Sequence, residues 1–250
     1  MKKILNLAVC VMGLFALVGC GSKESAVLKM ATEATFPPYE FLQGSEIVGI
    51  DVEIVRAIAA KLNKGFVCEN MMFDSVIPAV ISKKADIAAA GITVTPDRQK
   101  NVDFSIPYVK TGIVFIYKKD KPVLKGEQAK GLKVGVQAGT TSDNYVLEKL
   151  GQEPERFDST AMAVAALKVG RVDCVLADID PAKNCVRDEA QLAISDFITS
   201  EEYALAIRKG NAELLKLANE TIAELQASGQ IAAWVEKWTK VADALKDKDK

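Results

Sequence analysis

Residues 79–98 read AVISKKADIAAAGITVTPDR and contain three consecutive elements of an α/β fold. The stretch begins inside an expected helix at 74–84 and continues into Asp86–Ala90, an apolar run short enough for a buried parallel strand. Thr95 then takes the N-cap position of a further helix, and Pro96 takes its first position, where a missing N–H costs nothing. A helix, a buried strand and a capped helix in succession indicate an α/β sheet.

The residues on either side extend this alternation of strands and helices. Val27–Ala31 and Phe66–Met71 are expected strands, and Asp51–Leu62 is an expected helix because its apolar residues recur at helical spacing. A second α/β unit follows further along the chain. Its expected strands and helices are 133–137, 142–150, 162–169 and 172–177.

Two apolar, strand-like segments, 111–117 and 202–207, lie between and after these units. A chain that leaves one domain and returns to it would use two such crossings as a hinge. Asn211 is expected to cap a helix at 212–226, which returns to the first lobe with a further helix at 231–239. The expected division is lobe 1 at 28–110 and 206–242, lobe 2 at 113–201, hinge strands near 109–118 and 200–208, and a charged, fraying tail at 243–250.

The composition excludes several classes of function. The sequence has 250 residues, with 32 Lys and Arg, 33 Asp and Glu, and no His. Without histidine, Ser-His-Asp and Cys-His catalysis and histidine-ligated zinc are ruled out. Nucleic acid is not an expected partner, because no basic patch or arginine-rich arm is present. We expect no cofactor and no metal.

The first 27 residues are expected to be a signal and a tether. A short positive region precedes the apolar stretch Ile4–Val18, which suits a secretory signal peptide at 1–19 better than a membrane-spanning helix. Leu17-Val18-Gly19-Cys20 resembles the bacterial lipobox, which implies lipidation of Cys20, palmitate included, and a lipidated tether at 20–27. An ordinary cleaved signal with an incidental cysteine is the alternative.

Beyond Cys20 the sequence contains only three cysteines, Cys68, Cys174 and Cys185. An odd number permits at most one disulfide, and only Cys174 and Cys185 are close in sequence. Their apolar neighbours favour buried packing, although a bridge between these two stays possible.

The junction at 91–98 has the chemistry of an anion site. Backbone N–H groups at the start of the expected helix and the Arg98 guanidinium converge there. A planar carboxylate fits arginine best, because two N–H groups can engage both of its oxygens. The alternative, in which Arg98 pairs with a surface acid such as Asp97 or Asp103, is equally compatible with this local pattern.

A second strand-to-helix junction contains Gly139, Thr140, Thr141 and Ser142. It could also face an anion, but it has neither a P-loop nor a GxGxxG pattern, and an ordinary turn is the alternative. Two such junctions, one on each unit at the carboxyl end of a strand, favour a ligand in the cleft between the units.

Four further residues are candidates for this cleft. Asp178 directly follows a strand of the second unit and could hold an ammonium group, or it could lie on the surface. Asp180 is instead expected to cap a helix that starts at Pro181. Phe36, Tyr39 and Phe73 lie next to strand ends and could cover an aliphatic or guanidinium chain, although such aromatics usually belong to the core.

Five segments in a fixed order resemble one protein family. They are ATEATFPPYEF (31–41), VGIDVE (48–53), FDSVIP (73–78), AGITVTPDR (90–98) and VGVQAGTT (134–141). Together they resemble the polar amino-acid branch of the bacterial extracellular solute-binding proteins, over about residues 28–240. The resemblance implies a two-lobed, periplasmic-binding-protein-like α/β fold of type II with the ligand cleft between the lobes. Such proteins close over an amino acid and deliver it to the permease of an ABC importer.

The resemblance also implies roles for ten residues. Arg98 would clamp the ligand α-carboxylate with Thr93 and the backbone N–H of Thr141, and Asp178 would pair with the α-ammonium group. The others are Gly91 through its backbone, Thr140 in the second junction, the stacking aromatics Phe36 and Phe73, Glu33 at the side-chain tip, and Gln137 at a variable specificity position. Ala90 departs from the serine of several relatives that bind cationic amino acids.

Glu33 with two flanking aromatics suits a guanidinium or ammonium tip. The expected ligand is therefore a polar or basic amino acid, with arginine favoured over lysine, histidine or glutamine. We expect a monomer in the cell envelope, in the periplasm or on the extracellular face, with the lipid anchor as its membrane attachment. An enzyme is not expected. The alternatives are a cyclohexadienyl-dehydratase-like enzyme, with Glu33 or Asp178 as general acid, and an amino-acid sensor domain.

Overall fold

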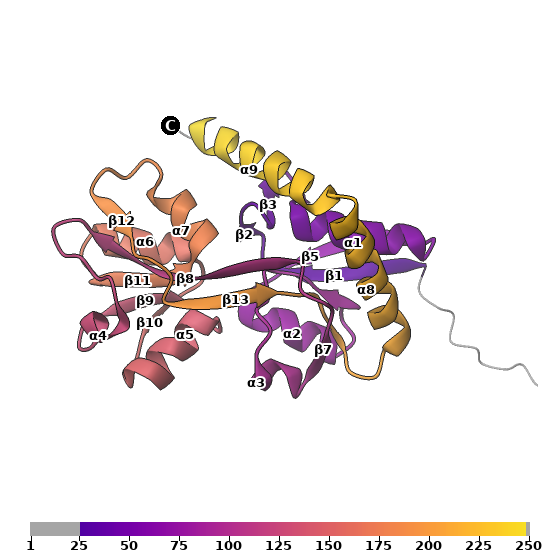
Figure 1. The fold of residues 1–250 in the computed structure, drawn as a ribbon, viewed down its shortest axis with the longest axis horizontal. Helices are drawn as coiled ribbons and strands as arrows, with labels where there is room; N and C mark the ends of the chain where they lie inside the picture. Colours follow the sequence, from indigo (N-terminus) through magenta and orange to yellow (C-terminus); the bar gives the residue numbers. More distant parts are fainter. Residues whose placement is uncertain (1–25, 249–250) are drawn as a thin grey trace, which may run out of the picture.

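The structure, a computed structural model, describes residues 26–248. The expected signal peptide at 1–19, Cys20 and nearly all of the tether at 20–27 lie outside these residues. Within the described range, no helix is long and apolar enough to cross a membrane. Figure 1 shows two lobes joined by extended strands, with one long helix above them.

Lobe 1 is built on a five-stranded sheet. In spatial order its strands are β5 (Gly65–Asn70), β1 (Val27–Thr32), β6 (Ile87–Ala88), β14 (Ala206–Arg208) and β7 (Val102–Phe104). β1 is parallel to both β5 and β6, whereas β14 is antiparallel to β6 and β7. Parallel pairing at the sheet centre requires helical crossovers, which cover both faces.

Helices bury both faces of the lobe 1 sheet. α1 (Ile50–Lys61) and α8 (Ala212–Ala227) share one apolar cluster with β1, and α2 (Phe73–Ile81) packs on the opposite face. A small three-stranded sheet adds to the first face. Its strands are β2 (Thr35–Phe36), β3 (Glu40–Gln43) and β4 (Glu46–Val48).

Lobe 2 repeats the α/β construction around a second sheet. In spatial order its main strands are β10 (Glu155–Phe157), β9 (Val134–Gln137), β11 (Cys174–Asp178), β8 (Val109–Lys118) and β12 (Leu192–Ile194). α6 (Thr160–Lys168) and α7 (Ile179–Val186) cover one face. The other face carries α4 (Gly126–Ala129), α5 (Thr141–Tyr145) and a π-helical turn, Val146–Leu150.

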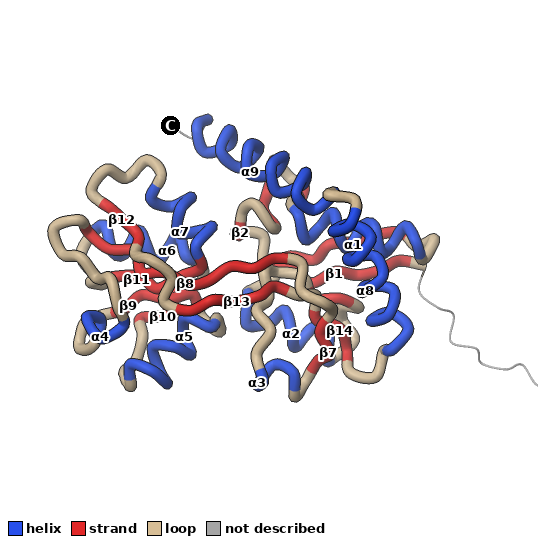
Figure 2. The backbone as a smooth tube through the Cα atoms, in the orientation of Figure 1, coloured by secondary structure: helices blue, strands red, loops and turns tan. Residues whose placement is uncertain are grey.

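Two extended strands run between the lobes. β8 leaves lobe 1 and enters the lobe 2 sheet, and β13 (Thr199–Tyr203) returns beside it in antiparallel register, from Thr199 opposite Ile113 to Tyr203 opposite Val109. After β13 the chain continues directly into β14 of the lobe 1 sheet. Figure 2 shows these strands side by side where the lobes meet.

The carboxyl-terminal part forms two helices. Asn211 caps α8 as expected, because its side chain accepts a hydrogen bond from the Leu214 N–H at 3.4 Å. The expected fraying tail at 243–250 is wrong for the residues that the structure describes. α9 (Gln230–Lys248) continues through them and reaches lobe 2, where Asp243 and Asp247 form ion pairs with Arg187.

Two local expectations are also corrected. α2 begins at Phe73, so Asp74 lies in its first turn. The strand-like segment 202–207 is divided between β13 and β14, because each part pairs with a different sheet. Cys68, Cys174 and Cys185 are free thiols, in agreement with the favoured expectation, and the possible bridge between Cys174 and Cys185 is absent.

Candidate functional site

A narrow cavity of about 10 Å³ lies between the two lobes, which are closed against each other. All ten residues singled out from the sequence line it, together with Ala90. Lobe 1 contributes Glu33, Phe36, Phe73, Ala90, Gly91, Thr93 and Arg98, and lobe 2 contributes Gln137, Thr140, Thr141 and Asp178. The carboxyl ends of strands in both sheets therefore meet at one small, enclosed space.

Arg98 is fixed at the start of a short capped helix, α3 (Pro96–Gln99). As the sequence predicted, Pro96 is its first residue and the Thr95 hydroxyl accepts from the Arg98 N–H, at 3.2 Å. The guanidinium donates to the backbone carbonyls of Thr93 at 2.8 Å and Gly139 at 3.2 Å. Since Gly139 belongs to lobe 2, this arginine already joins the two lobes.

The Arg98 side chain forms no ion pair with the surface acids Asp97 and Asp103, which were its alternative partners. Asp97 pairs with Lys100 at 2.9 Å, and Asp103 accepts from the Gly210 N–H. Burial lowers the pKa of Arg98, while nearby carboxylates oppose that shift. The Phe73 ring centroid lies 5.4 Å from the guanidinium carbon, so this aromatic also stacks on Arg98.

Asp178 is the acidic counterpart on lobe 2. It ends β11, stands at the N-cap position of α7, and is 8% exposed. Its carboxylate accepts a hydrogen bond of 2.5 Å from the Tyr203 hydroxyl. Burial and the charge of Glu201 raise the pKa of Asp178 to about 7, against the opposing effects of Tyr203 and Arg98.

The expectation that Asp180 caps a helix starting at Pro181 is wrong. α7 begins two residues earlier, at Ile179, which places Asp180 in its first turn. The Asp180 carboxylate instead accepts from the Tyr39 hydroxyl of lobe 1 at 2.7 Å. Its role is therefore a contact between the lobes.

The second junction is a tight turn between β9 and α5. Gly139 adopts a left-handed φ of 74°, and the Thr140 hydroxyl donates to the Gln137 carbonyl at 2.8 Å while accepting from the Asp143 N–H. Thr141 is the first residue of α5, so its N–H has no carbonyl partner within the helix. The turn thus presents the Thr141 N–H to the cavity, whereas the Thr140 hydroxyl hydrogen is already engaged by the Gln137 carbonyl.

Glu33 and Gln137 meet from opposite lobes. The Gln137 side-chain amide donates to the Glu33 carboxylate at 3.3 Å, and the Thr35 hydroxyl donates to the same carboxylate at 2.7 Å. Burial raises the pKa of Glu33, and these hydrogen bonds partly reverse the shift. Glu33 is therefore a second buried acid whose polar partners are all neutral.

The backbone of Gly91 is fixed by a hydrogen bond to a buried carboxylate and by the Phe36 ring. Its N–H donates to the fully buried Asp51 carboxylate at 3.0 Å, and its φ is 54°. A Cβ at this position would lie 2.6 Å from the Phe36 ring, so only glycine fits. Glu40 is also fully buried, and its pKa is raised well above the usual range by burial and by Asp51.

Sequence reasoning missed Glu201 and Tyr203, which lie on the same side of β13. The Thr93 hydroxyl donates to Glu201 at 2.6 Å, and Tyr203 holds Asp178. The alternating burial of β13 places both residues inward. A carboxylate at an inward position of a strand was the signal that could have revealed Glu201.

Comparison with known proteins agrees with this geometry. The model of "Bacterial extracellular solute-binding proteins, family 3" matches residues 28–241. The chain belongs to this family. Among other family 3 solute-binding proteins, the arginine-binding extracellular protein ArtP of Bacillus subtilis is 32% identical over 251 residues, which cover 95% of this chain and 98% of ArtP.

Solved structures of relatives show the same two-lobed, type II fold. Holo ArgBP from T. maritima is 37% identical, with a TM-score of 0.77 over 85% of this chain and 96% of that one. An ancestral arginine-binding protein bound to arginine is 39% identical, with a TM-score of 0.78 over 85% of this chain and 98% of that one. An ancestral arginine-binding protein bound to glutamine is also 39% identical, with a TM-score of 0.79 over 86% of this chain and 98% of that one.

Proposed function

We propose that this family 3 protein binds one free amino acid between its lobes, with L-arginine favoured over lysine, histidine and glutamine. It then delivers the amino acid to the permease of an ABC importer. The observation that supports the proposal is that one cavity is lined by both Arg98 of lobe 1 and Asp178 of lobe 2.

Both charged groups have neutral hydrogen-bond partners. Arg98 donates to two backbone carbonyls, and Asp178 accepts from a phenol. Buried charges are stable only when they are paired, and a zwitterion supplies a carboxylate for Arg98 and an ammonium group for Asp178. The Thr141 N–H and the oxygen atoms of Gly91, Thr93 and Thr140 complete the polar part of the proposed site. The Gly91 N–H and the two threonine hydroxyl hydrogens already have acceptors within the protein.

The preference for arginine rests on Glu33. Arg98 and Asp178 influence each other's pKa, as close charges do, whereas the pKa of Glu33 is set by burial and its own hydrogen bonds. Glu33 can therefore accept a guanidinium group while the other two residues hold the backbone of the ligand. In this proposal Gln137 tunes that subsite, and the Phe36 and Phe73 rings line the path of the side chain.

Closure of the lobes links binding to delivery. We propose that β8 and β13 act as the hinge, because they are the strands that run between the two sheets. A ligand held by both lobes stabilises the closed arrangement specifically, so the permease can distinguish loaded protein from empty protein. Glu33 and Asp178 serve as acceptors here, and no catalytic step is proposed.

The proposed location is the outer side of a membrane. Lipidation of Cys20 would hold a monomer at the surface through residues 20–27, as the lipobox-like segment indicates. Replacing Cys20 with alanine should release the protein into the soluble fraction and remove the acyl mass from its amino-terminal peptide. An unchanged membrane fraction for Cys20→Ala would contradict the anchor.

Thermal unfolding in the presence of each of the twenty amino acids tests the proposed ligand. A bound ligand raises the free energy of unfolding by RT ln(1 + [L]/Kd), so L-arginine should give the largest rise in melting temperature. No shift with any amino acid would contradict the proposal. Formation of an aromatic product from prephenate or arogenate would instead support the enzyme alternative.

A further inference from the structure

The carboxyl-terminal helix α9 contacts both lobes. On lobe 1, the buried Trp238 packs edge-on against Phe41 with ring centroids 6.0 Å apart, and Lys237 pairs with Glu53 at 3.2 Å. The helix then extends past lobe 1 and reaches α7 of lobe 2 (Figure 1). It is thus a connection between the lobes that is separate from β8 and β13.

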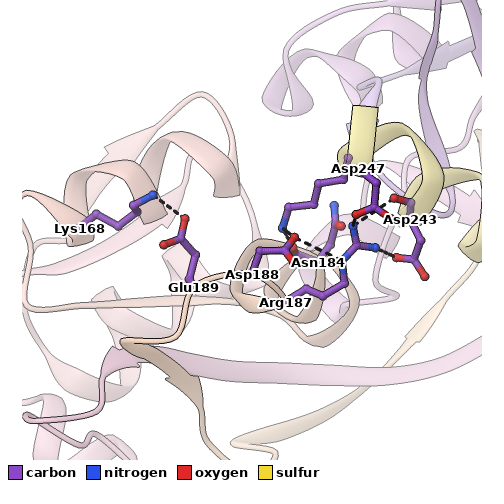
Figure 3. Close-up of polar contacts among 8 residues, drawn as sticks. Lys168, Asn184, Arg187, Asp188, Glu189, Asp243 and Asp247 are labelled. Atoms are coloured by element: carbon purple, nitrogen blue, oxygen red, sulfur yellow. Dashed lines mark hydrogen bonds and ion pairs between the residues drawn. The ribbon is translucent and has the colours of Figure 1, made fainter. Parts of the chain in front are cut away.

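A polar network, which we call the α7–α9 latch, joins the ends of the two helices (Figure 3). Its members are Asn184, Arg187, Asp188, Asp243, Lys246 and Asp247. Arg187 follows the last residue of α7, and its guanidinium donates to the Asp243 carboxylate, to the Asp243 carbonyl at 3.1 Å and to Asp247 at 3.0 Å.

In a second set of latch contacts, the cation comes from α9 and its acceptors lie at the end of α7. Lys246 of α9 donates to the backbone carbonyl of Asn184, and its ammonium nitrogen lies 3.7 Å from the Asp188 carboxylate. Single exposed ion pairs contribute little to stability. Here each helix supplies both a cation and an anion, and the side chains of Arg187 and Lys246 are only 28% exposed, which favours a cooperative network.

Helix α7 connects the latch to the cavity. Asp178 stands at its N-cap and Arg187 at its C-cap, nine residues later, so they are about 14 Å apart along the helix at 1.5 Å per residue. At the cavity end, Asp180 also accepts from Tyr39 of lobe 1. A displacement of the latch end therefore moves the carboxylate that faces Arg98.

We propose that the α7–α9 latch positions Asp178 and favours the closed arrangement of the lobes. None of its six members lines the cavity, so its effect on the ligand is indirect, through α7 and through the closure of the lobes. The apparent Kd equals the intrinsic Kd divided by the fraction of protein in the binding-competent state. A contact that favours closure consequently tightens binding, an inference that rests on the proposed function.

Charge reversal at Arg187 tests the latch. The variants are Arg187→Glu, the charge-swapped Arg187→Glu/Asp243→Lys/Asp247→Lys, and the control Lys168→Ala. The control removes an ion pair with Glu189 that lies wholly within lobe 2, at 2.5 Å (Figure 3). Small-angle scattering without added amino acid gives the radius of gyration, and calorimetry gives the Kd for L-arginine, both at low ionic strength.

Arg187→Glu should increase the radius of gyration and weaken L-arginine binding about 5- to 50-fold, within the range of typical coupling between sites. The charge-swapped variant should recover both values, and Lys168→Ala should match wild type. Asp247→Asn gives a milder version of the same comparison if Arg187→Glu does not fold.

Scattering by Arg187→Glu that equals wild type would overturn the latch, and so would equal changes in Lys168→Ala. A wild type that does not bind L-arginine, combined with an expanded Arg187→Glu variant, would overturn the proposed ligand and support the latch. The two hypotheses therefore fail in distinguishable ways.

Discussion

Protonation of Asp178 should make ligand binding depend on pH. Its pKa is raised to about 7, so below that pH the free protein carries a proton that an ammonium ligand must displace. We expect affinity for L-arginine to fall as pH drops below about 7, with proton release on binding. Calorimetry in buffers of different ionisation enthalpy measures both effects. Asp178→Asn should bind weakly without this slope, and a pH-independent wild-type affinity would contradict the assignment.

The same raised pKa has a defined effect on stability. The unfolded chain loses the Asp178 proton near pH 3.9, whereas the folded protein keeps it until about pH 7. The contribution of Asp178 to the free energy of unfolding therefore declines as pH rises from about 4 to about 7, and it is constant above that range.

Gly91 provides a residue-scale test of the cavity wall. Gly91→Ala would force a side chain into left-handed backbone and against the Phe36 ring, which should cost about 1–3 kcal/mol of stability and weaken amino-acid binding. The matched control is Gly44→Ala, which has a similar φ of 64° but no atom within 4 Å of the added Cβ. Equal affinity losses in the two variants would contradict the proposed role of Gly91.

At the scale of elements, the cap of α3 determines where Arg98 lies. Thr95→Ala removes the hydroxyl that accepts from the Arg98 N–H, which should cost about 0.5–2 kcal/mol of stability and reduce L-arginine affinity. Thr95→Ser keeps the hydroxyl and should retain both. Denaturant unfolding and calorimetry provide the two readouts. An alanine variant with wild-type affinity would show that the cap does not position the guanidinium.

Local pattern explains which elements could be predicted. The cap at Thr95 and Pro96, the apolar periodicity of α1 and the Asn211 cap depend on neighbours in sequence, and all are present in the structure. The ten predicted residues also line one cavity. Their convergence followed from the resemblance to a family, since spacing alone placed Arg98 equally well on the surface.

Contacts between distant segments could not be predicted in this way. Asp180 looked like a helix cap, but its partner Tyr39 lies 141 positions away. Arg187 and Asp247 are 60 positions apart, and no periodicity links them. The charged carboxyl terminus therefore looked like a fraying tail, because its solvent exposure could be estimated from composition while its partners on α7 could not.

At the scale of the whole molecule, the account depends on one ligand joining two lobes. Within the described part of the chain, the lobes meet through β8 and β13, the cavity contacts, the hydrogen bond between Tyr39 and Asp180, and α9. Each cavity contact pairs groups that an amino acid could also engage. We therefore expect ligand binding and lobe closure to be coupled, because the ligand supplies charged partners for Arg98 and Asp178.

Calorimetric titration of Arg98→Ala with L-arginine tests this claim most directly. Truncating one partner of a buried charge pair typically costs about 2–5 kcal/mol, so the account predicts a loss of that size in a variant that remains folded. Arg208→Ala, which removes a lobe 1 arginine outside the cavity, should bind like wild type. An Arg98→Ala protein that binds L-arginine with wild-type affinity would contradict the account.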